Sequence, residues 1–290
     1  MTAPRGSTLR RRRLGHELRR LREEANRTHI DISKVLDCTQ GRISKIEAGF
    51  LAIRPMEVKV VLDYLAVPEP EWEPLIALAK EAREQGRWHK HASVMTSKFI
   101  TYANLEAEAT RICTYEAEVV PGLMQTEAYA NAVNHVTRPR DDIDAERYTE
   151  VRLARQERVL NGELNLWVVL NESAIRRVVG GERVMREQLQ HLLELAHQPS
   201  VTLQVLPFSA GQHPAMSGPF VITRFEDRRQ DPDVIYLENQ TGGLYLEDKA
   251  DIERYNLTFD RLIADALDVG RSAKLIGQVI DELSGETIPY

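Results

Sequence analysis

The sequence predicts an all-α N-terminal bundle followed by a mixed α/β (α+β) C-terminal domain. Apolar residues recur at helical spacing through roughly the first 85 residues, whereas short β-branched runs alternate with helical segments in the remainder. The start of the chain is net basic, whereas the remainder is net acidic. A length of 290 residues favours two domains, which we place at residues 1–86 and 87–285.

Five short helices are expected in the first domain. Steps of four, three and four place these apolar residues on one face of the first helix: Leu14, Leu18, Leu21 and Ala25. The second helix begins after Thr28. The third covers residues 40–48, between an N-cap at Thr39 and a C′ glycine at Gly49. Two further helices and a domain junction follow at residues 57–65, 71–85 and 86–93.

The second domain mixes helices with strands. Helical spacing of apolar residues predicts helices at about residues 101–110, 124–136, 143–161, 182–197, 248–267 and 270–283. Short runs rich in β-branched residues and bounded by turn residues predict strands at residues 164–170, 201–206, 220–225 and 234–237.

Cysteine content and hydropathy narrow the function classes. The two cysteines, Cys38 and Cys113, are far apart in the sequence, which is typical of a chain in a reducing cytosol. The sequence contains no run of about 18 apolar residues, which a membrane-spanning helix would need. The basic start of the chain is not followed by the apolar segment of a secretory signal. We therefore expect a cytoplasmic location and no membrane partner.

Charge is segregated along the chain. The net charge is -6, but residues 1–49 hold 12 Lys and Arg against 6 Asp and Glu, and the remainder holds 26 against 38. A basic part joined to an acidic part is expected when only one part meets the phosphates of nucleic acid. A solvated basic tail at residues 10–13 is the alternative explanation.

Residues 28–49, THIDISKVLDCTQGRISKIEAG, have the pattern of a helix-turn-helix, in which a short turn separates two short helices. The second helix of this motif lies in the major groove of DNA and presents its N-terminal residues to base edges. The predicted base contacts are therefore Gln40, Arg42, Lys45 and Ser44. Phosphate contacts are predicted for residues at the helix starts and in the basic N-terminus: Thr28, His29, Thr39, Arg10, Arg11, Arg12 and Arg13.

Two runs in this region, ELRRLRE at residues 17–23 and RIS-x-IE-x-G at residues 42–49, match a known pattern. They resemble the xenobiotic-response-element-type helix-turn-helix of bacterial and phage repressors, which implies an all-α DNA-binding domain. The sequence departs from the common pattern at His29, where many members have Gln, and at Asp37, where many have Gly. It also departs at residues 32–33, near which Ala is common.

Four segments within residues 114–225 carry a second resemblance: TYEAEVVPGLMQTEAYANAV, RLARQERVL, VVLNESAIRRVVGG and VTLQVLPFSAGQHPAMSGPFVITRF. They are similar to the C-terminal domain of actinobacterial WhiJ-like, antitoxin-like regulators. The resemblance implies a transcription factor that is often encoded beside a small partner protein, which it is thought to bind.

Other candidate residues lie in or near the second domain. His213 and Met216 belong to a Gly/Pro-rich loop at residues 206–218, and long loops often contact ligands or partners, although a plain connection is the alternative. Arg155 is a third candidate for a ligand or partner contact, with helix-surface pairing as the alternative. The H-x-H pair at residues 89–91 lacks further metal ligands, so we predict no metal and no cofactor.

The sequence thus predicts a sequence-specific transcription regulator that is not an enzyme. It contains no nucleophile elbow, phosphate-binding loop or zinc-protease motif. We expect a homodimer that binds pseudo-palindromic, double-stranded operator DNA through its first domain. The second domain is expected to sense a small partner protein or a ligand. The alternative is an antitoxin-like module whose main role is to bind the small partner protein.

Overall fold

The computed structural model describes residues 9–83, 97–137, 142–227, 231–239 and 242–285. The chain divides into two compact units, Met1–Glu108 with Asp227–Asp231 (unit 1) and Ala109–Glu226 with Pro232–Tyr290 (unit 2). Each unit has a hydrophobic core of its own. The predicted domain boundary at residues 86–87 and the H-x-H pair at residues 89–91 lie outside the described residues.

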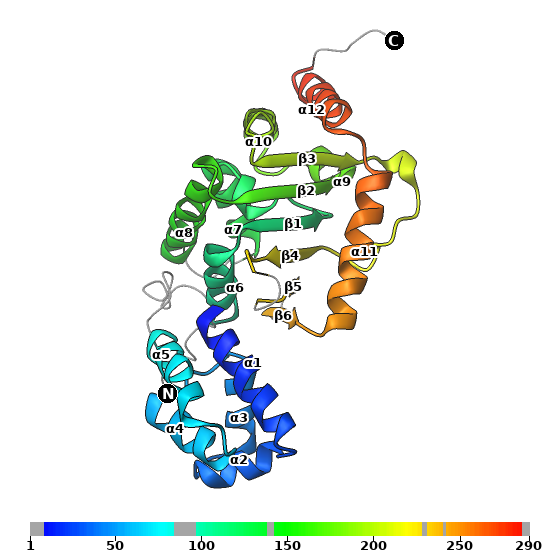
Figure 1. The fold of residues 1–290 in the computed structure, drawn as a ribbon. Helices are drawn as coiled ribbons and strands as arrows, with labels where there is room; N and C mark the ends of the chain where they lie inside the picture. The colour runs from blue at the N-terminus through cyan, green and yellow to red at the C-terminus, as the bar shows by residue number, and fades with distance from the viewer. Residues whose placement is uncertain (1–8, 84–96, 138–141, 228–230, 240–241, 286–290) are drawn as a thin grey trace. The chain divides into compact units, whose positions relative to one another are not determined.

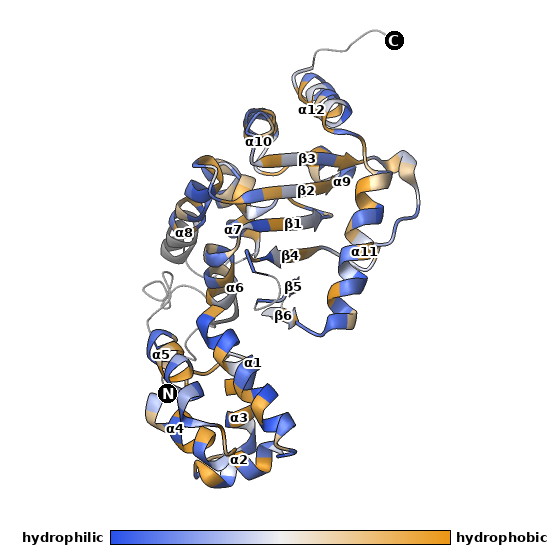
Figure 2. Cartoon of the chain, viewed as in Figure 1, coloured by the Kyte–Doolittle hydropathy of each residue, from blue (hydrophilic) through white to orange (hydrophobic). Residues whose placement is uncertain are grey.

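Unit 1 is helical (Figure 1). Its helices are α1 (Leu9–Glu24), α2 (His29–Val35), α3 (Gln40–Glu47), α4 (Pro55–Tyr64), α5 (Trp72–Glu81) and α6 (Ser97–Glu108), with a 310 turn, η1 (Glu69–Glu71), before α5. Figure 2 shows hydrophobic and hydrophilic residues interspersed along α1 to α5, as amphipathic helices require. Their apolar faces form one core, which includes Leu14, Leu18, Ile32, Ile43, Ile46, Val58, Val61, Leu62 and Ala79. The helices predicted for the first domain are confirmed.

Unit 2 is built on a six-stranded mixed sheet (Figure 1). Its strands are β1 (Arg111–Glu116), β2 (Asn165–Asn171), β3 (Val201–Leu206), β4 (Phe220–Arg224), β5 (Val234–Asn239) and β6 (Gly242–Leu246). Their order across the sheet is β3-β2-β1-β4-β5-β6. Strands β1, β2 and β3 are parallel, whereas β4, β5 and β6 pair antiparallel with their neighbours.

Helices connect and cover this sheet. They are α7 (Glu127–Thr137), α8 (Asp142–Leu160), α9 (Glu172–Arg176), α10 (Glu182–Leu195), α11 (Lys249–Asp265) and α12 (Val269–Leu283). Phe259 and Leu262 of α11 pack into a core with Cys113, Phe220 and Ile222 of the sheet. The predicted mixture of helices and strands is confirmed. None of the described helices is long and apolar enough to span a membrane.

Two strands and one short helix are absent from the predicted set. Strand β1 has no continuous apolar run, because Thr114 separates Cys113 from Tyr115 and a charged residue lies at each end of the strand. Strand β6 begins with two glycines, which are depleted in strands. Gly243 is needed there, because a Cβ at this position would lie 2.6 Å from Cζ of Tyr236 on the neighbouring strand. Helix α9 is only five residues long, too short for a periodic signal.

Candidate nucleic-acid interface

A tight turn at residues 36–39 joins α2 to α3. The Cys38 N–H donates to the Ser33 carbonyl (2.9 Å) and the Asp37 N–H donates to the Lys34 carbonyl (3.3 Å), the two bonds of a Schellman motif. Asp37 adopts the left-handed conformation (φ 45°) that this motif requires at C′. Glycine adopts this conformation at lower cost, which explains why Gly is common at this position of the resembling sequences.

Each helix of the motif has a threonine as its N-cap residue. Thr28 and Asp31 form a capping box, in which the Thr28 N–H donates to the Asp31 carboxylate (2.8 Å) and the Asp31 N–H donates to Thr28 Oγ1 (3.3 Å). Thr39 Oγ1 accepts a hydrogen bond from the Arg42 N–H (3.3 Å). Both threonines are exposed at helix starts, and their contact with phosphate stays a prediction.

Helix α3 has one buried face and one exposed face. Ile43 and Ile46 are buried in the core of unit 1. Gln40, Ser44 and Lys45 are exposed on the opposite side. Side chains four residues apart lie on the same face of a helix, so the structure brings Gln40 and Ser44 together, and Lys45 is exposed at the next position along the helix. Three of the four predicted base contacts are therefore exposed on α3.

Glycines let α1 and the C-terminal end of α3 pack at close range. Gly49 has a φ of 71° and ends α3 as the predicted C′ residue, with its N–H donating to the Ile46 carbonyl (2.9 Å). A Cβ on Gly49 would lie 2.7 Å from Cγ of Arg12, and a Cβ on Gly15 would lie 2.6 Å from the Ile46 carbonyl oxygen. The position of α3 against α1 therefore depends on two residues without side chains.

A buried ion pair fixes α3 against α1 and α2. The Glu47 side chain is 6% exposed, and its carboxylate accepts hydrogen bonds from Arg22 Nε (2.7 Å) and Nη2 (2.8 Å). The hydrogen bond to Glu47 raises the pKa of the Arg22 guanidinium. His29 Nε2 lies 2.9 Å from the same carboxylate. The His29 ring, predicted to contact phosphate, is therefore hydrogen-bonded inside unit 1.

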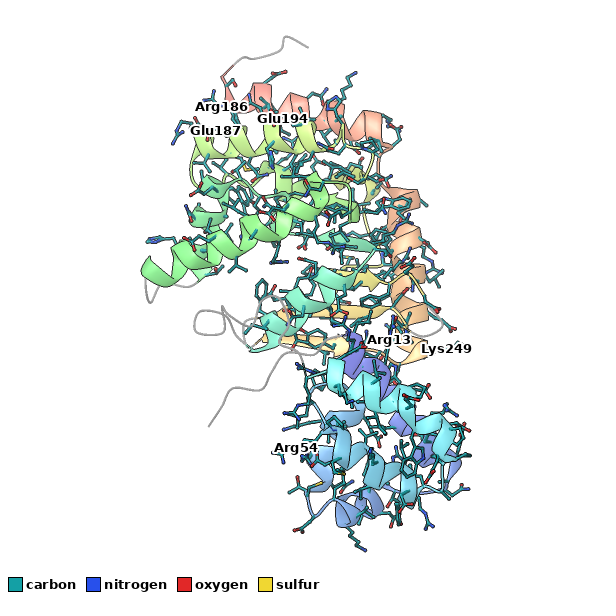
Figure 3. The ribbon with its side chains drawn as sticks, turned by 60° about the vertical axis from the view of Figure 1, so that its left-hand side comes forward. Arg13, Arg54, Arg186, Glu187, Glu194 and Lys249 are labelled. Carbon is teal, nitrogen blue, oxygen red and sulfur yellow. The ribbon has the colours of Figure 1, made fainter. Side chains whose placement is uncertain are left out.

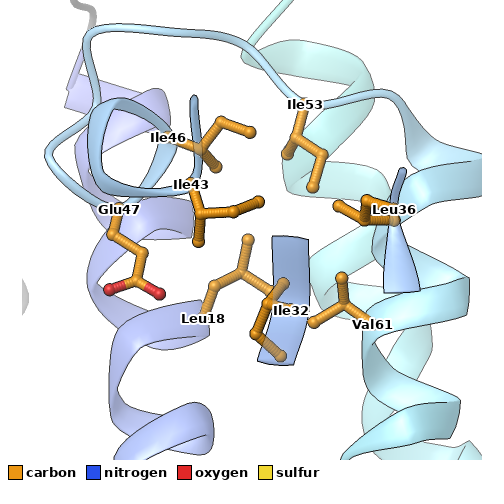
Figure 4. Close-up of a pocket in the computed structure, with 8 residues that line it drawn as sticks. All are labelled: Leu18, Ile32, Leu36, Ile43, Ile46, Glu47, Ile53 and Val61. Carbon is orange, nitrogen blue, oxygen red and sulfur yellow. The ribbon is translucent and has the colours of Figure 1, made fainter. Parts of the chain in front are cut away.

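A small cavity lies between the helices of the motif (Figure 4). Apart from the Glu47 side chain it is lined by apolar residues of the core: Leu18, Ile32, Leu36, Ile43, Ile46, Ile53 and Val61. These residues hold the two helices of the motif against α1 and α4. The cavity therefore belongs to the structural core.

Arg42 bridges α3 and α4. Its Nη2 lies 2.9 Å and 3.0 Å from the two carboxylate oxygens of Glu57, and the side chain is only partly exposed. The Glu57 carboxylate also accepts a hydrogen bond from the N–H of Arg54 (2.9 Å), so it caps α4 as well. Arg54 is exposed at the start of α4 (Figure 3). The structure thus gives Arg42, a predicted base contact, a carboxylate partner within the protein.

The arginines at the start of the chain do not form an extended arm. They lie within α1, and Arg11 and Arg12 are each 2% exposed. Arg11 Nε donates to the Ala82 carbonyl (2.7 Å). The phosphate contacts predicted for Arg11 and Arg12 are corrected accordingly, because buried guanidinium groups have no surface to offer DNA.

Arg10 and Arg13 are nearer the surface. Arg10 Nε lies 3.2 Å from the Glu81 carboxylate, and both side chains are about half exposed. Arg13 (Figure 3) forms a forked ion pair with the buried Asp231, with Nε 2.6 Å from Oδ1, and this hydrogen bond raises the pKa of the Arg13 guanidinium. Of the four arginines, Arg10 retains the most surface for a phosphate.

Sequence reasoning missed the residues that position the motif: Arg22, Glu47 and Glu57. A signal was present for two of them. Arg22 follows Leu18 by four residues and Glu47 follows Ile43 by four residues, so each charge lies on the apolar stripe of its helix. A charged residue in such a place is expected to be buried with a partner.

The candidates in unit 2 lie in different surroundings. His213 Nε2 lies 3.4 Å from the Tyr115 hydroxyl, and the ring is partly buried. Met216, in the same loop, is 72% exposed. Arg155 lies on α8 and is buried, and its contact with a ligand or partner stays a prediction.

Helices α2 and α3, their turn and the exposed face of α3 define a helix-turn-helix protein of the DNA-binding class. A comparison with protein-family models supports this class, because residues 13–75 match a helix-turn-helix domain. Residues 99–278 match the "Domain of unknown function (DUF5753)", and the chain belongs to that family. No curated protein and no solved structure matches the chain.

Proposed function

We propose that the chain is a sequence-specific transcription regulator that reads DNA bases with α3. The observation that carries the proposal is the two-sided character of this helix. Its inner face is fixed by Ile43, Ile46 and the buried ion pair of Glu47, while Gln40, Ser44 and Lys45 are exposed. A rigid helix with polar residues exposed near its N-terminus suits the major groove.

Each exposed residue of α3 has a suitable partner in DNA. Gln40 is at the first position of the helix, and a glutamine amide pairs with N6 and N7 of adenine. Lys45 reaches guanine or a phosphate, and Ser44 donates to or accepts from several bases. Thr28, Thr39 and Arg10 are proposed to contact phosphates, which fix the register of the protein on the duplex.

We propose that the protein binds DNA as a homodimer. A single α3 of eight residues reaches few base pairs, and two copies read a pseudo-palindrome with half-sites roughly 34 Å apart. The basic charge of residues 1–49 supports attraction to the phosphates of both half-sites.

Two alanine variants test the proposal. DNA selected from a random pool by the full chain serves as probe in a mobility-shift assay at one stated salt concentration. We expect Gln40→Ala and Lys45→Ala each to weaken binding about tenfold or more, at unchanged melting temperature. Lys249→Ala on α11 (Figure 3) removes the same charge from unit 2 and should have little effect. Unchanged affinity in both α3 variants would contradict the proposal.

We also propose that unit 2 senses an effector, either a small partner protein or a ligand. Its separate core supports an independent role, and the segments that resemble WhiJ-like regulators lie within the residues matched to the family. The test is to co-express the full chain with the product of any neighbouring small gene and to analyse the mixture by size-exclusion chromatography. A complex that weakens or strengthens DNA binding supports the proposal, and separate elution argues for a ligand instead.

A further inference from the structure

The loop between β3 and β4 crosses the carboxyl ends of the parallel strands. Leu206 at the end of β3 is in register with Asn171 at the end of β2, and Phe220 at the start of β4 is in register with Tyr115 near the end of β1. Residues 207–219 therefore pass from one side of these two strand ends to the other, as Figure 1 shows. Open α/β sheets commonly bind ligands at this edge.

Hydrogen bonds at this edge link Asn171, Tyr115 and His213. The Ser173 N–H donates to Asn171 Oδ1 (3.0 Å), which fixes the orientation of the Asn171 amide. Asn171 Nδ2 therefore donates to the Tyr115 hydroxyl oxygen (3.3 Å). Burial raises the pKa of Tyr115, so this hydroxyl keeps its proton, and we assign it as the donor to His213 Nε2, which lies 3.4 Å from the hydroxyl oxygen.

His213 is the last residue of this series of hydrogen bonds. Burial lowers the pKa of this imidazole, so the ring is neutral at pH 7 and carries one proton. With Nε2 assigned as the acceptor of the Tyr115 hydrogen bond, the proton of the neutral ring lies on Nδ1. Nδ1 is buried, and it has no hydrogen-bond partner among the described residues. A buried donor without an acceptor costs about 1–3 kcal/mol, so the loop as folded is less stable than it would be with an acceptor at this atom.

Two glycines at positive φ delimit a short segment of this loop. Gly211 (φ 68°) and Gly218 (φ 129°) bracket residues 212–217, and a side chain at either glycine would strain these conformations. Between them only Ala215 is buried. Met216 (72% exposed) within this segment and Phe208 (58% exposed) before it present apolar surface.

We propose that residues 207–219 form a hinged lid over a ligand site at the carboxyl ends of β1 and β2, in which His213 Nδ1–H binds a neutral carbonyl oxygen of a small amphiphilic molecule. Two carboxylates near the site favour a neutral acceptor over an anion, because negative charges repel each other. The charge of Asp265 is close enough to His213 to oppose the lowering of its pKa, and the Glu172 carboxylate accepts a hydrogen bond from the Phe208 N–H (2.7 Å) at the start of the loop. Phe208 and Met216 supply apolar contacts for the rest of the molecule. The site deepens the effector-sensing part of the proposed function, but it is tested without DNA.

The test titrates hexanamide into the full chain and follows the ¹⁵N-histidine resonances. Hexanamide offers a neutral carbonyl and a short apolar chain, hexanoate offers an anion, and hexylammonium chloride offers no acceptor. We expect hexanamide to shift the His213 Nδ1 resonance and to bind about tenfold more tightly than either control. Tighter binding of hexanoate, or no shift with hexanamide, would overturn the proposal.

Two isosteric variants localise the donor. An asparagine carries its amide nitrogen at the position of Nδ1, whereas a glutamine carries it at the position of Nε2. We expect His213→Gln to lose about tenfold in affinity for hexanamide and His213→Asn to retain most of it. Both melting temperatures are measured to verify folding. Equal binding by wild type and His213→Gln overturns the role of Nδ1, and it leaves DNA binding through α3 unaffected.

Discussion

In unit 1 the buried carboxylate of Glu47 is held by Arg22 and His29, whereas in unit 2 the buried Nδ1 of His213 has no partner among the described residues. The two sites differ in what their polar groups do. A fully paired group fixes the elements around it, so α3 has one orientation and one exposed face. An unpaired donor costs stability until something else supplies an acceptor. The paired carboxylate of Glu47 therefore suits a rigid reading surface, and the unpaired Nδ1 of His213 is the atom that the proposed ligand would satisfy.

The largest effect is expected from breaking the paired site. Glu47→Ala leaves the Arg22 guanidinium buried without its carboxylate, which should lower the free energy of unfolding of unit 1 by about 3–5 kcal/mol. Urea unfolding followed by Trp72 fluorescence, with Trp88 and Trp167 replaced by Phe, measures this unit alone. Glu24→Ala removes an exposed ion pair on α1 and serves as the control, because such pairs contribute at most about 1 kcal/mol. Equal losses in the two variants would contradict the comparison.

Two glycine-to-alanine variants in the same unit distinguish the effect of close packing from that of helix propensity. Gly15→Ala places a methyl group against the Ile46 carbonyl, and we expect it to destabilise unit 1 by roughly 1–3 kcal/mol. Gly41→Ala lies in α3 with nothing within 4 Å of the new Cβ, so it should be neutral or stabilising by up to about 1 kcal/mol. The same fluorescence titration distinguishes them. A stabilising Gly15→Ala would show that α1 and α3 are not in close contact.

The variant Tyr115→Phe tests which nitrogen of His213 carries the proton. This change removes the donor to His213 Nε2, so the proton of the imidazole is free to move to Nε2. We expect the Nε2–H tautomer to become populated and the stability of unit 2 to fall by about 1 kcal/mol. The ¹⁵N chemical shifts of His213 report the tautomer directly. An unchanged tautomer would mean that Tyr115 does not determine the proton position.

The smallest effect concerns pH. Burial raises the pKa of Glu116 to about 8, so the folded state holds its proton more tightly than the unfolded state. The stabilising contribution of the neutral form is complete below the unfolded pKa of about 4.5, and it is lost as the pH rises through about 8. Because Glu116 as a whole residue keeps some surface exposed to water, the solvent offsets part of this effect and the change should be small.

Glu116→Gln replaces the titratable carboxyl group by an amide, so it should flatten the pH dependence of the melting temperature between pH 5 and about pH 9. Glu118→Gln, two residues along and exposed, is the control and should leave the wild-type dependence intact. A wild-type melting temperature that rises over this range would have the opposite sign to the one expected.

The helices of unit 1 were predictable, because apolar spacing, threonine caps and a terminal glycine all agree in residues 14–49. The exposed face of α3 follows from the same pattern. The burial of Arg12 was not predictable, since a run of arginines is the same in sequence whether it is solvated or packed under other helices. Arg11 precedes Leu14 by three residues and so lies on the apolar stripe, which is the same signal that was present for Arg22. The helical phase of Leu14 and Leu18 does not reveal what packs beside the preceding turn.

In unit 2 the long apolar strands were predictable and β1 was not, although it lies at the centre of the sheet. Its polar residues are explained by tertiary contacts: the Thr114 hydroxyl donates to the carbonyl of Phe220 on β4. The relation between Tyr115, Asn171 and His213 also depends on strand order, which local sequence does not contain. The loop at residues 206–218 was identified by its composition, but its hydrogen-bond partners were not.

The most direct test of DNA reading is a double-mutant cycle between Gln40 and an adenine of the selected operator. The adenine is replaced by 7-deazaadenine, which lacks the N7 acceptor, and affinities are measured for wild type and Gln40→Ala. If Gln40 pairs with this base, the replacement weakens wild type roughly tenfold and leaves the variant unchanged. Equal loss in both proteins at every adenine of the operator would show that Gln40 does not read adenine and that α3 is not placed in the groove as proposed.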